Sequence, residues 1–257
     1  MDEQTALKYF GRENYRRALE GFLELLEEAR KEGDKEKIAH TSNFAALCLY
    51  FLHQPEDALD YFEIALKHTE GADKMKVQAN IDEVNRFVER IKKDIEEIEN
   101  RLENETDTKN KGILLSNLGL LHYLIGHSAE AEKNLKAAEK IFRNMNNSIA
   151  LGAIYTNLAL LYDDMRQLDY LHRALDIFEE EGHIKGQIDT LHALALYYLF
   201  EDSFEEAYYF VKKELALLDH IDNNEIKKRA YELAADLCME LGKVDEGMKF
   251  TEMASKL

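Results

Sequence analysis

Apolar residues recur along this chain at the spacing of one helix face, and the stretches come in pairs. The pair at residues 114–142 is the clearest example. Its first stretch contains Leu114, Leu115, Leu118, Leu121 and Ile125, and its second contains Ala131, Leu135, Ala138 and Phe142. Spacings of three and four residues are typical of an amphipathic helix. Gly126 and Ser128 lie between the stretches, and this combination predicts the end of one helix and the start of another. The pattern therefore predicts a helix hairpin.

Small residues occur in pairs twelve positions apart, with one member in each helix of a predicted hairpin. The pairs are Ala6 and Ala18, Ala46 and Ala58, Gly119 and Ala131, Ala195 and Ala207, and Ala235 and Gly247. Helices approach closely only where their side chains are small, so each pair predicts a contact inside a hairpin. In a sixth copy Ala159 precedes Leu171 by the same twelve residues, so one member there is large.

This register resembles the tetratricopeptide repeat (TPR) over nearly the whole chain. The matching positions in the clearest copies are Leu118, Gly119, Ala131, Leu135 and Ala138, then Leu158, Ala159, Tyr162, Leu175 and Phe178, then Leu194, Ala195, Tyr198, Phe204, Ala207 and Val211. Most copies repeat after about 40 residues instead of the standard 34, which resembles the longer repeats of peptide-sensing bacterial regulators and polarity adaptors. The chain has no Trp for the position where the family carries one, and Tyr155 and Tyr231 stand there. The resemblance implies an all-α, right-handed superhelical solenoid of about six hairpins.

One predicted helix, at residues 73–105, has no partner in the repeat. Its apolar positions alternate between spacings of three and four, as in a coiled-coil seam: Ile81, Val84, Val88, Ile91, Ile95, Ile98 and Leu102. Two interpretations are open. The seam packs on neighbouring helices of the same chain, or it pairs with a second copy to form a homodimer. In either case the helix divides the array into residues 1–72, 73–105 and 106–257.

The charge and composition exclude several classes of function. The net charge is -18, and no basic stripe offsets it, so we expect no nucleic-acid partner. A surface this acidic favours solubility first, and basic or neutral partners second. No apolar run reaches the length of a membrane span, and the acidic N-terminus has no signal core. The two cysteines lie in apolar helical stretches, which suits a reducing cytoplasm.

The sequence contains no arrangement typical of an enzyme or a metal centre. His122 and His127 are five residues apart, a spacing that places them on different faces of a helix. Residues 219–225 are acidic but lack the spacing and central glycine of a calcium loop. A Gly-Lys pair at 242–243 lacks the upstream glycine of a phosphate loop. We therefore expect no catalytic residue, no metal and no cofactor.

The TPR resemblance implies that the first helix of each hairpin lines a concave groove. The positions that it would place there are Asn43, Asn117, Asn157, His192, Leu47, Leu120, Leu160, Leu196, Tyr50 and Tyr123. An Asn amide can donate to a peptide carbonyl and accept from a peptide N–H, and a leucine-lined groove suits an amphipathic helix. The competing interpretation is that these asparagines are merely solvated and that the leucines belong to the core.

The function that fits these features is a non-catalytic adaptor, which binds a peptide or helix of another protein in its groove. Two alternatives remain. One is a regulator that changes shape when a short peptide binds. The other is a structural homo-oligomer built on the seam from Ile81 to Leu102.

Overall fold

The computed structural model describes all 257 residues, and every regular element in it is a helix. The chain folds into two compact units, Met1–Asn134 and Leu135–Leu257. The first unit contains α1 (Glu3–Gly11), α2 (Tyr15–Glu32), α3 (Lys35–Phe51), α4 (Pro55–His68), α5 (Gly71–Asn104) and α6 (Thr108–Leu124). The division falls within α7 (Ser128–Asn144). The second unit continues with α8 (Ser148–Ala159), α9 (Met165–Glu180), α10 (Ile184–Phe200), α11 (Phe204–Leu215), the short 3-10 helix η1 (Leu218–His220), α12 (Asn224–Glu240) and α13 (Val244–Ser255).

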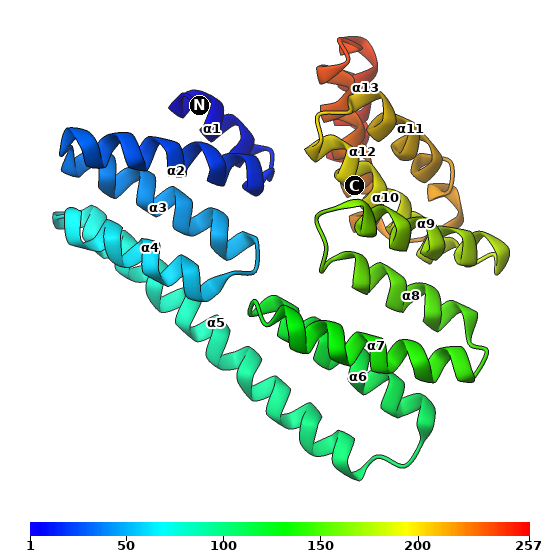
Figure 1. Cartoon of the computed structure of the whole chain (residues 1–257). Coiled ribbons are helices and arrows are strands. Elements are labelled where there is room, and N and C mark those ends of the chain that lie inside the picture. The colour runs from blue at the N-terminus through cyan, green and yellow to red at the C-terminus, as the bar shows by residue number, and fades with distance from the viewer. The chain divides into compact units, whose positions relative to one another are not determined.

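In each unit the helices pack mainly on their neighbours along the chain. In the first unit α1 packs on α2, and the order continues to α6; in the second unit it runs from α8 to α13 (Figure 1). Packing between sequence neighbours is the property that defines a solenoid. The all-α hairpin architecture predicted from the sequence is confirmed within both units.

The small-residue pairs are buried, as their spacing predicts. Ala6, Ala18, Ala46, Ala58, Ala195 and Ala207 have no exposed surface. At Gly247 of α13 the helices approach closely, because a Cβ atom there would lie 3.2 Å from the Ala235 carbonyl oxygen of α12. Each pair therefore marks the level along the two helix axes at which the helices of a hairpin pack closely.

Five hairpins share one turn geometry. Three residues link the helices, and the middle one has a positive φ: Glu13, His53, Gly126, Asp202 and Gly242. In each case this residue comes seven positions after the small residue of the first helix. The α8–α9 hairpin is the exception, since five residues link its helices.

The long helix α5 has 34 residues and agrees with the predicted range 73–105. Its seam is covered from within the first unit. The N-terminal half, including Ile81, Val84 and Val88, packs against a cluster of α3 and α4 that contains Phe62. The C-terminal half packs against α6, and the residues in that contact are Ile91, Ile95, Ile98, Leu102, Leu118, Leu121, Leu124 and Ile125. Packing within the chain, the first of the two interpretations, is therefore what the structure shows.

Candidate functional site

Three of the residues expected in the groove lie on the face of α3 that α5 covers. The Asn80 side-chain amide of α5 donates to Asn43 Oδ1 at 3.4 Å. The ring of Tyr50 meets the edge of Phe87, also on α5, with the ring centroids 5.7 Å apart. Leu47 packs against the cluster that α5 shares with α3 and α4. These residues hold the long helix in place and do not line an open groove.

Tyr123, near the end of α6, packs against the turn between α3 and α4. Its ring lies edge-on to His53, with the centroids 4.7 Å apart. The two chain segments approach closely here, because a Cβ atom at Gly126 would lie 3.1 Å from the His53 carbonyl oxygen. Burial raises the pKa of Tyr123 and lowers that of His53, so both side chains favour their neutral forms. Both side chains are half-buried, so Tyr123 is held against the α3–α4 turn.

Asn117 and Leu120 do lie on an open surface. They line a groove of about 460 Å³ between α5 and α6, together with Asp94, Glu97, Ile98, Arg101, Leu121 and Leu124. The volume is within the usual range of ligand sites, roughly 300–1,000 Å³. Asn117 and Leu120 are the two of the ten expected groove residues that line the groove between α5 and α6.

The groove follows from the same spacing on both of its helices. The four lining residues of α5 stand at positions 94, 97, 98 and 101, and those of α6 at 117, 120, 121 and 124. Each set has the spacing i, i+3, i+4, i+7, which places four side chains along one stripe of a helix. The remaining six residues could have been found from this shared spacing, once α5 was known to lie beside α6.

The floor of the groove is apolar, and its rim is polar with a negative net charge. Ile98, Leu121 and Leu124 are half-buried against the cluster between α5 and α6, and they keep part of their surface open. The charged lining residues are Asp94, Glu97 and Arg101. An apolar floor with an acidic rim suits an amphipathic helix that carries basic residues beside its apolar stripe.

A polar hollow continues from the groove to the C-terminal end of α5. It shares Glu97 and Arg101 with the groove and adds Asn100, Asn104 and Glu105. Glu105 accepts backbone N–H bonds from Asp107, at 2.9 Å, and from Thr106, at 2.8 Å. These bonds lower the pKa of the Glu105 carboxyl and hold it charged at the start of the α5–α6 loop.

In the second unit the expected groove residues have different environments. Leu160 is 43% exposed, Asn157 is half-buried, and Leu196 packs against the main core cluster of this unit. His192, expected on a groove, lies instead inside the α10–α11 hairpin. Its Nδ1 is 3.1 Å from each carboxylate oxygen of Glu214, a residue with no exposed surface. The expectation failed because the partner of His192 lies 22 residues away on the facing helix.

The two cysteines of the chain lie in its interior. Cys48 and Cys238 are buried free thiols, and burial raises the pKa of Cys48 to about 12 and also that of Cys238. A thiol with a raised pKa is a poor nucleophile. No cluster of three or more His, Cys, Asp or Glu side chains is placed to hold a metal ion. None of the helices combines the length and the hydropathy that a membrane crossing requires.

Comparison with known proteins finds similarity at the level of structure. No protein-family model matches the sequence, and no curated protein matches it either. Among solved structures, BtubC (BKLC) from P. vanneervenii is 14% identical and aligns over 94% of this chain and 90% of its own, with a TM-score of 0.52. Aspartyl phosphate phosphatase F from Bacillus subtilis is also 14% identical, with a TM-score of 0.56, over 89% of this chain. The match spans 53% of the phosphatase, so this chain corresponds to about half of that protein.

A putative kinesin light chain from Podosopora anserina with nearly identical TPR-like repeats aligns over 84% of this chain, at 14% identity and a TM-score of 0.48. The chain shares its fold of stacked helix hairpins with BtubC and with aspartyl phosphate phosphatase F. At these identities the similarity concerns the fold alone. Stacked repeats of this kind present an extended surface along the array.

Proposed function

We propose that this protein is a non-catalytic interaction scaffold that binds an amphipathic helix of a partner protein in the groove between α5 and α6. The observation that carries the proposal is the groove itself. It combines an apolar floor with Asn117 and three charged side chains at its rim. A helix that buries its apolar stripe in such a groove uses anchors at the spacing i, i+3, i+4, i+7.

The charges of the groove indicate the polar face of the partner helix. Asp94 and Glu97 outnumber Arg101, and the whole chain carries a net charge of -18. Basic residues on the partner would be attracted to this rim and would approach faster at low salt. Asn117, which is exposed, could bond the backbone or a polar side chain of the same segment.

A homo-oligomer built on the seam of α5 is less compatible with the packing. Val84, Ile91 and Ile95 are at most 8% exposed and already lie against helices of the same chain. A second copy would have to displace these contacts before it could pair with the seam. The groove needs no such rearrangement, because its lining residues already reach the surface.

The test is a selection of helical peptides from a displayed library, followed by affinity measurements on the selected peptides. Fluorescence anisotropy would compare wild type, Leu120→Glu and the control Met75→Glu. Met75 also lies in the first unit, at the solvent-exposed start of α5, and its variant introduces the same charge. We expect Leu120→Glu to weaken binding at least about tenfold, as for a residue central to an interface. Met75→Glu should bind as wild type does.

Two further measurements locate the peptide. Amide exchange of the complex should slow in both α5 and α6, around Ile98 and Leu120. Asp94→Lys should weaken basic peptides selectively and leave neutral ones unchanged. If selected peptides bind wild type and Leu120→Glu equally, while both proteins unfold at the same temperature, the groove is not the binding site.

A further inference from the structure

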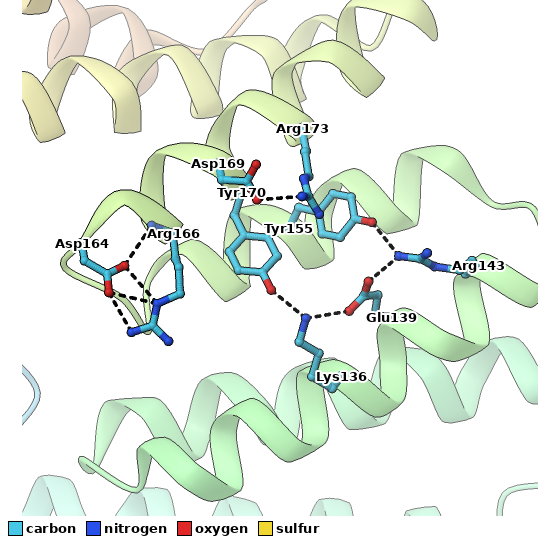
Figure 2. A network of polar contacts seen from close by, with 9 residues as sticks. All are labelled: Lys136, Glu139, Arg143, Tyr155, Asp164, Arg166, Asp169, Tyr170 and Arg173. Carbon is cyan, nitrogen blue, oxygen red and sulfur yellow. Dashed lines mark hydrogen bonds and ion pairs between the residues drawn. The ribbon is translucent and has the colours of Figure 1, made fainter.

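A second surface, in the other unit, has the opposite charge preference. It is a network of polar contacts on α7, α8 and α9 (Figure 2). Lys136 Nζ donates to the Tyr170 hydroxyl at 2.7 Å and to Glu139 Oε2 at 3.1 Å. Arg143 Nη2 donates to Glu139 Oε1 at 2.6 Å and to the Tyr155 hydroxyl at 2.9 Å. One carboxylate thus holds two cations, and each cation is also held by a tyrosine.

The buried members of this network lie beneath its cations. Tyr155 is 6% exposed and the Glu139 side chain 13%, whereas the side chains of Lys136 and Arg143 are 40% and 61% exposed. Partial burial lowers the pKa of Lys136, but its bonds to Tyr170 and Glu139 outweigh this and raise the pKa overall. The two cations are therefore charged, and fixed in position before any ligand arrives, which reduces the entropy lost on binding.

Stacked rings extend this surface along α9. Tyr162 stacks on Tyr170, with the ring centroids 5.6 Å apart, and Tyr155 lies 5.8 Å from Tyr170. The guanidinium of Arg166 lies 4.1 Å above the Tyr162 ring, and that of Arg173 lies 5.9 Å from the Tyr170 ring. Cation–π contacts of this kind hold both guanidinium groups beside the rings. Both are also ion-paired, Arg166 with Asp164 at 2.8 Å and Arg173 with Asp169 at 2.9 Å (Figure 2).

The local charge differs from that of the rest of the molecule. Residues 136–173 contain five basic residues, Lys136, Lys140, Arg143, Arg166 and Arg173, and four acidic ones, Glu139, Asp163, Asp164 and Asp169. Their net charge is +1, while the whole chain carries -18. An acidic ligand is therefore repelled less by this stretch than by the chain as a whole.

Several donors of the network are still available. Both contacts of Arg143 use Nη2, so its Nε and Nη1 groups can bind another acceptor. Lys136 has three N–H bonds and makes two contacts. The Tyr170 hydroxyl accepts from Lys136, which leaves its own proton to donate. Carboxylate oxygens are acceptors only, so they match this set of donors.

We propose that this face of α7–α9 binds an acidic segment of a partner protein, through carboxylates that accept hydrogen bonds from Arg143, Lys136 and Tyr170. Leu160 and Met165, in the loop before α9 and at its first residue, are 43% and 73% exposed. A segment with an apolar residue beside its carboxylates therefore fits best. This inference depends on the second unit alone and stands independently of the α5–α6 groove.

The probe is a fluorescein-labelled peptide of repeated Glu-Glu-Leu, compared with its Gln-Gln-Leu and Lys-Lys-Leu counterparts. The full-length protein is titrated into each peptide, and anisotropy is measured at low and at high salt. We expect the Glu peptide to bind, the other two not to bind, and added salt to weaken the complex. A fourth peptide, with phosphoserine in place of Glu, shows whether the surface prefers to bind phosphate or carboxylate groups.

The decisive variant is Lys136→Gln/Arg143→Gln, and its matched control is Lys228→Gln/Lys249→Gln. The control removes two exposed charges from α12 and α13 of the same unit. We expect the network variant to weaken the Glu peptide at least about tenfold, as for charge-paired contacts, and the control to leave its affinity within about twofold. Tyr170→Phe removes one donor and should give a smaller loss at an unchanged melting temperature.

Three outcomes would overturn the proposal. The first is a wild-type protein that does not bind the Glu peptide at low salt. The second is an equal loss of affinity in the network variant and its control, which would show that only the total charge matters. The third is binding of the phosphoserine peptide alone.

Discussion

Two hairpins of the second unit, α8–α9 and α10–α11, keep the same repeat register but turn at different places. α10 runs five residues beyond Ala195, and α11 begins three residues before Ala207. α8 stops at Ala159 itself, and α9 begins six residues before Leu171. The other four hairpins follow the α10–α11 arrangement. The position of the turn can therefore move while the twelve-residue contact between the helices is kept.

The capping residues account for the displaced turn. Asp164 accepts the backbone N–H of Arg166 at 2.9 Å and starts α9 early. In the α10–α11 hairpin the capping residue is Ser203, three positions later in the register, and its side chain makes no capping bond. Asp202, which has a φ of 56° there, corresponds to Arg166, which is already in the helix. The early turn also exposes Leu160 and places Arg166 over Tyr162.

The interiors of the two hairpins differ as well. Seven residues after Ala207 stands Glu214, paired with His192 in the core. The corresponding residue of α9 is Phe178, which is 4% exposed. Its ring fills the space beside Gly152 of α8, where a Cβ atom would lie 2.9 Å away. One hairpin is therefore closed by an aromatic ring, and the other by a buried hydrogen-bonded His–Glu pair.

The largest expected effect comes from removing one partner of that buried His192–Glu214 pair. His192→Leu leaves the Glu214 carboxylate buried without its partner, and we expect a loss of about 3–5 kcal/mol in the free energy of unfolding. The double variant His192→Leu/Glu214→Met makes the site apolar, as at Phe178, and should recover most of that loss. Urea unfolding measures both. A single variant that costs less than the double variant would show that the pair does not couple the two helices.

A second comparison exchanges the residue sizes at the helix contact. Leu171→Ala leaves a cavity beside Ala159 and should cost about 2–5 kcal/mol. Ala207→Leu overpacks the regular hairpin and should cost about 1–3 kcal/mol. Both sites are at most 1% exposed, so thermal or urea unfolding reports the packing itself. If Ala207→Leu proved neutral, the small pairs would not set the distance between the helices.

The hairpins and the long helix could be predicted from the sequence because their signals are local. Gly126 and Ser128 mark the turn that the structure places at residues 125–127, and the run without Gly or Pro after residue 72 is one helix to Asn104. The displaced turn was harder to predict. Ala159 and Leu171 keep the twelve-residue spacing, which predicts a turn in the usual place, whereas Asp164 caps α9 three residues earlier.

The candidate site could be predicted only in part, because it depends on which helix lies beside which. Asn117 and Leu120 follow from their repeat positions, and they line the groove. Tyr50 occupies the position equivalent to Tyr123, but α5 covers it. The repeat pattern assumes that the first helices line an open groove, and the extra helix occupies part of that surface. The sequence also gives no local signal that Glu214 contacts His192 on the facing helix.

The smallest expected effect comes from the cap that displaces the turn. Asp164→Ala removes the side-chain acceptor of the Arg166 N–H and should cost about 1 kcal/mol, with faster amide exchange in the first turn of α9. The matched change in the regular hairpin is Asp202→Gly. It relieves a positive φ that costs a non-glycine residue energy, so it should leave stability unchanged or raise it by up to about 1 kcal/mol.

A stronger form of this prediction moves the turn itself. Asp164→Leu removes the early cap, Arg166→Gly supplies a residue that accepts a positive φ, and Gln167→Asn supplies the capping side chain that Asn14 provides at the same register position before α2. We expect the triple variant to extend α8 by five residues through position 164, as α10 extends through Phe200. Backbone chemical shifts of residues 160–164 would become helical. If they stay irregular while the protein remains folded, packing around Tyr162 holds the turn, and the cap does not.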